Sequence, residues 1–273
     1  MKKIVSLCLG LFWTITLEAQ SYTEVAAQAM QAVEQNELVE AEVLFKKALQ
    51  LEPANVRNAL LFSNLGTVQR RMNRVDEATE SYSLALNITP YAIPILLDRG
   101  SLYLERKLFS KAYVDYCQVL DVDRLNEEAL LYRAYIYVQR REYAEAQIDY
   151  KTLLTVEPNH KMAAMGLAWL LQKWNRQREA LEEYNRLQLV YPEDASILLA
   201  KAHLEVDMNS PDLALLTLEV ASKLTPDDAD IYLIRGDIYL LQKKKRTAKE
   251  AYEKAIALGV PRSELQECLK ACK

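Results

Sequence analysis

The side chains best suited to catalysis or metal binding are few and widely spaced. The chain has two histidines, His160 and His203, and four cysteines, Cys8, Cys117, Cys268 and Cys272. Zinc sites and nucleophile–base pairs need several such residues brought together. No histidine is near the last two cysteines in sequence. His160 follows Glu-Pro-Asn, and we expect it to be a turn residue rather than a ligand.

Catalytic sequence motifs are missing as well. Glycine occurs only 6 times, and neither a glycine-rich phosphate loop nor a nucleophile elbow is present. The carboxylates are abundant but form no distinctive pair, although an acid–base pair stays open as a distant alternative. We therefore expect no enzymatic activity, no metal and no cofactor.

Two local patterns near the C-terminus have alternative interpretations. Leu265, Cys268, Leu269 and Cys272 follow the i, i+3, i+4, i+7 spacing of a buried helix face, so we expect core residues. The alternatives are a disulfide, whose geometry an i, i+4 pair rarely meets, or a metal pair. The run Lys243-Lys244-Lys245-Arg246 reads as a solvated turn, with a contact to anionic lipid or an acidic partner as the alternative.

The first residues have the layout of a secretory signal peptide. Lys2 and Lys3 precede a largely apolar stretch of 14 residues, 4–17, and Ala19 supplies a small residue before Gln20. A membrane-spanning helix needs about 20 apolar residues, so this stretch is too short to span. We expect residues 1–19 to be removed near Ala19-Gln20, which predicts an exported, periplasmic protein with no integral membrane anchor.

Composition narrows the classes of partner. With 51% apolar and 26% charged residues the chain is an ordinary folded protein rather than a disordered one. Its formal net charge is −4, and removal of the proposed signal peptide would leave it slightly more acidic. Nucleic-acid binders usually carry a basic excess or stripe. We therefore expect no nucleic-acid partner.

A repeat organises the rest of the chain. One alanine recurs at separations of 37 and then 34 residues, and a small residue stands twelve positions before each copy. An aromatic residue or leucine follows four positions after each alanine, and most copies are followed by proline after twelve. The alanines are Ala41, Ala78, Ala112, Ala146, Ala180, Ala214 and Ala248.

These positions describe a pair of helices joined by a short turn. Small residues on both helices allow a close crossing, and the aromatic residue one turn later fills the space beside it. Proline cannot continue a helix, so we expect it to end the second helix. The pattern is periodic enough to predict seven such pairs.

This pattern resembles the tetratricopeptide repeat (TPR). The resemblance implies an all-α fold, a right-handed superhelical solenoid of helix-turn-helix repeats. We expect seven tandem repeats over 20–260 and a C-terminal capping helix over 261–273, started at a capping box of Ser263 and Gln266. No linker or further domain is predicted.

The resemblance also implies a concave groove lined by the first helices. Positions five and nine of each repeat then form a largely apolar stripe in repeats three to seven. Its residues are Leu97, Leu131, Tyr135, Met165, Trp169, Leu199, His203 and Leu233. For the leucines, packing between neighbouring first helices is an equal alternative. The carboxylate clamp of chaperone-tail-binding relatives is not reproduced, because position five never holds lysine; Asn64 matches, but Ala26 and Asp98 do not.

The function implied is a non-enzymatic scaffold of the cell envelope. It would bind an apolar or amphipathic segment of a protein or peptide partner in the groove. The alternative is a structural subunit that self-associates through its ends or convex face. The oligomeric state is left open.

Overall fold

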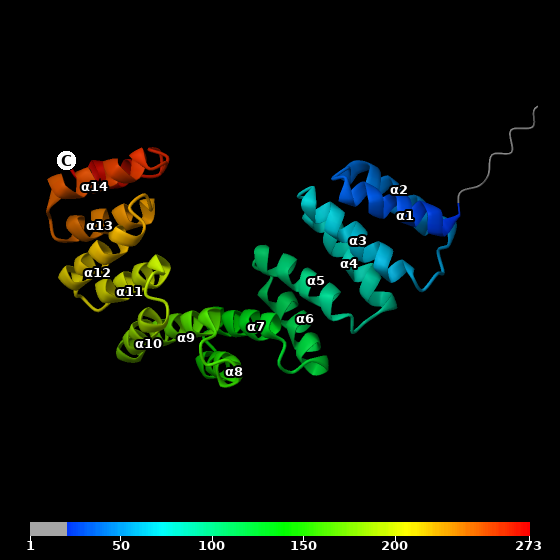
Figure 1. The fold of residues 1–273 in the computed structure, drawn as a ribbon, viewed down its shortest axis with the longest axis horizontal. Coiled ribbons are helices and arrows are strands. Elements are labelled where there is room, and N and C mark those ends of the chain that lie inside the picture. The colour runs from blue at the N-terminus through cyan, green and yellow to red at the C-terminus, as the bar shows by residue number, and fades with distance from the viewer. Residues whose placement is uncertain (1–20) are drawn as a thin grey trace, which may run out of the picture. The chain divides into compact units, whose positions relative to one another are not determined.

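The computed structural model describes residues 21–273, and the regular secondary structure of this part of the chain is entirely α-helical, without a β-strand (Figure 1). The proposed signal peptide lies outside the described residues. None of the described helices is both long enough and apolar enough to cross a membrane. The helices are α1 (Tyr22–Glu34), α2 (Leu38–Leu51), α3 (Asn58–Arg71), α4 (Val75–Ile88), α5 (Ile93–Glu105), α6 (Phe109–Val122), α7 (Glu127–Gln139), α8 (Tyr143–Val156), α9 (Lys161–Lys173), α10 (Gln177–Val190), α11 (Ala195–Asp207), α12 (Pro211–Leu224), α13 (Ala229–Leu241), α14 (Lys245–Ala257) and α15 (Gln266–Ala271).

The helices form two compact units, one ending at Leu102 and the other spanning Tyr103–Lys273. In the first unit, α1 packs on α2 and α3 on α4, and α2 joins the two pairs by contacting α3. In the second unit the pairs α7–α8, α9–α10, α11–α12 and α13–α14 stack in chain order. In both units these pairs are helical hairpins stacked in chain order, as the repeat pattern predicts for an all-α solenoid.

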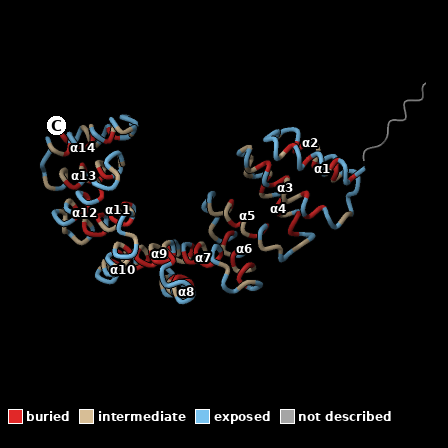
Figure 2. The backbone as a smooth tube through the Cα atoms, viewed as in Figure 1, coloured by how far each residue is buried: buried red, intermediate tan, exposed pale blue. Residues whose placement is uncertain are grey.

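The helix crossings explain the recurring small and aromatic residues. All seven repeat alanines are completely buried, and the residue four positions after each is buried too. Below the rings the space is tight: a Cβ added to Gly236 would stand 2.4 Å from Cε1 of Tyr252, and one added to Gly66 would stand 3.0 Å from the Tyr82 ring. Figure 2 shows the resulting buried segments along the helices of both units, with exposed loops between them.

The second helices end where the sequence predicts, although proline is not the whole cause. α2, α4, α8, α10 and α12 each stop two residues before a proline. However, α6 stops at Val122, two residues before Arg124, and the Asp123 N–H still donates to the Val119 carbonyl. The same backbone ending therefore forms without proline.

The turn inside each helical hairpin contains a feature that the alanine spacing does not reveal. Five positions before each repeat alanine, a non-glycine residue adopts positive φ, between 57° and 63°. Asparagine tolerates this left-handed conformation better than most L-residues. Four of the seven positions are Asn; the full set is Asn36, Asn73, Lys107, Arg141, Asn175, Asn209 and Lys243.

The C-terminal helix is shorter than expected. The predicted capping box of Ser263 and Gln266 is wrong, because α15 begins after Leu265 and has no side-chain cap. Residues 261–265 instead form successive turns, in which the Glu264 N–H donates to the Pro261 carbonyl. The apolar face still packs as expected: Leu265 and Cys272 are buried, and Cys268 and Leu269 are half-buried against the core of α14.

Candidate functional site

Seven of the eight predicted groove residues lie in the second unit, on the first helices α7, α9, α11 and α13. The eighth, Leu97, lies on α5 in the first unit. Tyr135 and His203 are exposed, Leu131 is buried, and Leu97, Met165, Trp169, Leu199 and Leu233 are half-buried.

The first helices of the second unit form a layer of their own. α7 contacts α9, and α11 contacts α13, in addition to the contacts within each hairpin. Positions five and nine of a repeat are one helical turn apart, so they share a face of their helix. We call this face of α7, α9, α11 and α13 the first-helix face.

An aromatic stack marks the first-helix face between α7 and α9. The Tyr135 and Trp169 rings lie 5.8 Å apart and nearly parallel, at 14°. Phe109 meets the Tyr135 ring edge-on at 6.3 Å, and the Lys173 Nζ lies 6.0 Å from the centre of the Trp169 ring. Rings held in this way lose little further conformational freedom when they bind a ligand.

A cavity of about 600 Å³ opens beside this stack. The charged side chains lining it are basic. Arg141 belongs to the left-handed turn of the α7–α8 hairpin, which the sequence analysis did not single out. The lining residues are Val138, Gln139, Arg141, Tyr143, Trp169 and Lys173.

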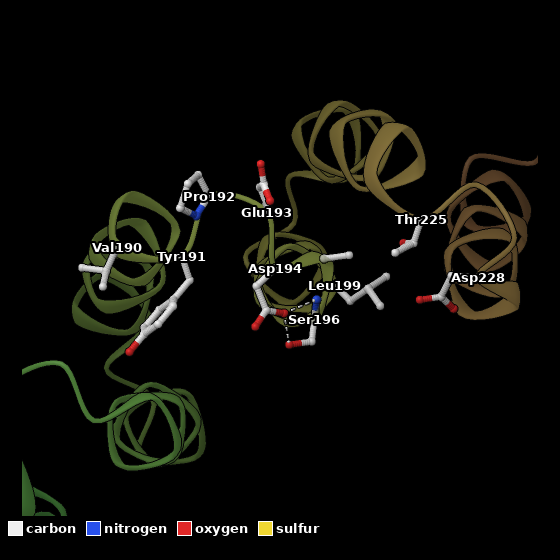
Figure 3. A pocket seen from close by; sticks show the side chains of 10 residues that line it. Val190, Tyr191, Pro192, Glu193, Asp194, Ser196, Leu199, Thr225 and Asp228 are labelled. Atoms are coloured by element: carbon white, nitrogen blue, oxygen red, sulfur yellow. Dashed lines mark hydrogen bonds between the residues drawn. The ribbon is translucent and has the colours of Figure 1, made fainter.

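A second cavity, of about 650 Å³, lies where α10 leads into α11 and α12 leads into α13 (Figure 3). In Figure 3 the Leu199 side chain of α11 points toward Thr225 and Asp228. Among the predicted residues only Leu199 contributes to it. The lining residues are Val190, Tyr191, Pro192, Glu193, Asp194, Ala195, Ser196, Leu199, Thr225 and Asp228.

Two carboxylates of this cavity also cap helices. Asp194 accepts hydrogen bonds from the N–H and the hydroxyl of Ser196 at the start of α11, and Asp228 accepts from the Asp230 N–H at the start of α13. Burial of Asp194 opposes its ionisation. The salt bridge from Lys161 and the two Ser196 donors outweigh burial and hold the pKa of Asp194 below its usual range. Asp194 is therefore a stably ionised cap.

The sequence leaves open whether the predicted groove leucines line the groove or pack between neighbouring first helices. Leu131 is 8% exposed and belongs to the core, which agrees with packing between helices. Leu199 is half-buried against the core of α11–α13, and Leu233 against that of α13–α14. Both keep part of their surface exposed beside the core.

His160 has a more specific role than the expected turn residue. It is the N-cap of α9, where its Nδ1 accepts a hydrogen bond from the Ala163 N–H at 3.2 Å. Its Nε2 lies 2.9 Å from Glu127 Oε1, and the residue is 8% exposed. The residue thus joins the start of α9 to the start of α7.

The cysteines and the other metal-binding side chains bear on the metal and disulfide alternatives. Within residues 21–273, no group of three or more His, Cys, Asp or Glu side chains is placed to hold a metal ion. Cys117, Cys268 and Cys272 are free thiols, so the disulfide alternative for the last two does not describe this structure.

A family model of the tetratricopeptide repeat matches residues 131–196 and 199–262. A tetratricopeptide repeat protein from Parabacteroides merdae is 33% identical, with a TM-score of 0.80, and the match covers 93% of this chain and 99% of that one. This similarity extends over nearly the whole chain.

Other solved structures share the fold at lower identity. Pseudomonas aeruginosa PilF is 19% identical with a TM-score of 0.57, over 79% of this chain and 97% of PilF. YrrB is 17% identical with a TM-score of 0.53, over 68% of this chain and 95% of YrrB.

Curated relatives match over shorter stretches. Human DnaJ homolog subfamily C member 7 is 29% identical over 85 residues, which is 31% of this chain and 17% of the relative. The rat mitochondrial import receptor subunit TOM34 is 28% identical over 110 residues, 38% of this chain and 36% of TOM34. The chain thus spans between a sixth and about a third of the length of these curated relatives.

Proposed function

Because this chain belongs to the tetratricopeptide repeat family, we propose that it is a scaffold that holds a segment of a partner protein against the first-helix face of its second unit. TPR proteins generally mediate protein–protein interactions. Fold alone does not define a ligand, so the proposal depends on the surface of this particular chain.

The observation that carries the proposal is the stack of Tyr135 on Trp169. Tyr135 remains 38% exposed although its ring is already fixed against a neighbour. Tyr and Trp are enriched among the residues that dominate binding energy at protein interfaces. A large, preorganised aromatic surface beside an open cavity suits an apolar or aromatic side chain of the partner.

The ligand proposed is an apolar or amphipathic peptide segment. Met165, Leu199 and Leu233 continue the apolar surface from the aromatic stack along α9, α11 and α13. An amphipathic helix laid in such a groove is an established recognition mode. YrrB is described as a TPR protein with an unusual peptide-binding site, and it shares this fold. A peptide ligand is consistent with that similarity.

We further propose that the protein works in the cell envelope. The support is the sequence pattern of residues 1–19, with its basic start, apolar stretch and small residue before Gln20. N-terminal sequencing of the protein recovered from its native cell fractions tests this part separately. A mature N-terminus near Gln20 in a periplasmic fraction is expected, and an intact Met1 in a cytoplasmic fraction would contradict it.

The test of binding is a selection of short peptides displayed on phage, followed by affinity measurements on a purified peptide. We expect the double variant Tyr135→Glu, Trp169→Glu to weaken a selected peptide at least 30-fold, because one central aromatic residue is commonly worth about 2 kcal/mol. Circular dichroism and thermal unfolding verify that the variant is folded.

The matched control adds the same two charges to α8, the second helix of the α7–α8 hairpin. Ile148 and Val156 of α8 are both 65% exposed, so Ile148→Glu, Val156→Glu adds two carboxylates without disturbing a core. This control should bind like the wild type. Peptides that bind wild type and both variants equally would refute the first-helix face as the binding site.

A further inference from the structure

We propose that the second cavity, between the starts of α11 and α13, receives a lysine or arginine side chain of the bound partner segment. This inference rests on the proposed function and gives the partner's chemistry at one position. We call the ten residues that line this cavity the basic-residue pocket.

The walls of the basic-residue pocket are amphipathic. Val190, Pro192 and Leu199 supply apolar surface, together with the ring of Tyr191. The Tyr191 hydroxyl donates to the Asn159 carbonyl, which holds the ring in place. A cavity of about 650 Å³ between two helix starts has ample room for one long side chain.

The ionisable carboxylates of the lining select the occupant. They are Glu193, Asp194 and Asp228, and no lysine or arginine lines the pocket. Asp194 already has a cation, since Lys161 forms a salt bridge with it from outside the lining. Glu193 and Asp228 therefore leave the pocket with a net negative charge that a partner can neutralise.

A further carboxylate at the start of α13 strengthens this preference. Asp230, two residues after Asp228 and in the first turn of α13, is exposed. Its charge adds to those of Glu193 and Asp228, which favours cationic groups and repels anionic ones. An acidic segment would therefore be disfavoured at this end of the first-helix face.

Other occupants fit less well. The described residues provide no cluster of three or more metal-binding side chains, which argues against a divalent cation here. A purely apolar group would bury carboxylates without a partner, at a cost in free energy. A lysine or arginine matches both parts of the pocket, because its methylene stem covers apolar surface while its charged head meets carboxylates.

The first experiment compares the peptides selected by wild type with those selected by Glu193→Gln, Asp228→Asn. Asn is as good an N-cap as Asp, so α13 should keep its start in the variant. We expect wild-type selections to be enriched in Lys or Arg at one position. Replacing that residue by norleucine should weaken wild-type binding about tenfold, as expected for a charge-assisted hydrogen bond, and weaken the variant hardly at all.

The outcomes separate this inference from the proposed function. Two results would overturn the basic-residue pocket and leave the proposed scaffold function standing. In the first, the selected peptides depend on Tyr135 and Trp169 but show no preference for Lys or Arg. In the second, the norleucine replacement weakens peptide binding equally in wild type and variant. If no peptide is selected, the proposed function fails, and a second measurement still tests the pocket.

That second measurement uses single amino acids as probes. N-acetyl-arginine methylamide is titrated into the labelled protein, with N-acetyl-norleucine methylamide as the uncharged probe, and amide shifts are followed by NMR. Binding in the basic-residue pocket predicts saturable amide shifts at Ser196 and Asp228 with the arginine probe. These shifts should be smaller in the variant Glu193→Gln, Asp228→Asn. Equal shifts with both probes, or none with either, overturn the pocket.

Discussion

Two buried glutamates show how surroundings decide the effect of a charge. Glu42 is 6% exposed, and burial alone would raise its pKa, but Arg74, Lys46 and Gln69 together lower that pKa to about 2. Glu205 is 1% exposed, and burial raises its pKa despite the hydrogen bond donated by Thr217 at 2.7 Å. The first carboxylate is stabilised as an anion, whereas the second is stabilised in its protonated form.

We predict that Glu205→Gln increases the free energy of unfolding at pH 7. The native state holds the Glu205 proton more tightly than the unfolded state does, so stability declines as pH rises from the ordinary Glu pKa through the raised one. The gain should shrink as the pH is lowered below the ordinary pKa. Urea titrations at several pH values measure it, and a loss of stability at pH 7 would contradict the assignment.

Glu42→Gln is the matched control, for which we expect the opposite change in the free energy of unfolding. Its native pKa is lowered, so the stabilisation exists above the ordinary Glu pKa and disappears as the pH falls toward about 2. The substitution should cost on the order of 2–3 kcal/mol at pH 7 and little at the acid end of that range. A constant cost at all pH values would mean that the ion pair with Arg74 is not its origin.

At the scale of the helical hairpin, the close crossing is the feature that the sequence determines best. The spacing of small residues, alanines and rings correctly indicates the pairs α1–α2, α3–α4, α7–α8, α9–α10, α11–α12 and α13–α14, and the burial of the repeat alanines and of the residue four positions after each. Two features escape it because they depend on backbone geometry. The left-handed turn residues include Lys107, Arg141 and Lys243, whose types give no signal, and Pro261 is followed by turns where the pattern suggests a helix.

We predict that Gly236→Ala lowers stability even though alanine is the better helix former. The new methyl group would stand 2.4 Å from the Tyr252 ring, and the ring is completely buried with little room to move. Overpacking of this kind typically costs about 1–3 kcal/mol. Chemical denaturation of the variant measures the loss.

Alanine at Gly66 provides the graded comparison. There the added Cβ would lie 3.0 Å from the Tyr82 ring, so a smaller shift relieves the contact. Gly66→Ala should therefore be less damaging than Gly236→Ala. The reverse order, or a gain in stability at Gly236, would show that the rings do not set the size limit at the crossing.

At the scale of the whole molecule, the sequence predicts the all-α solenoid but only part of the binding surface. Tyr135 and Trp169 are found from their repeat positions because both lie on regular helices. The basic-residue pocket cannot be found from repeat positions. Its residues Tyr191, Thr225 and Asp228 come from connections between hairpins, and the repeat pattern does not describe how these connections pack. Leu131 lies at a groove position and is nevertheless core.

Binding of a partner segment to the first-helix face is tested most directly by site-specific photocrosslinking of a selected peptide to the protein. Benzoylphenylalanine replaces His203, which is exposed on the first-helix face, or Ile148, which is exposed on α8. We expect a crosslink from position 203 that disappears in the Tyr135→Glu, Trp169→Glu background, and none from position 148. A crosslink from position 148 alone would place the partner on the second helices and refute binding at the first-helix face.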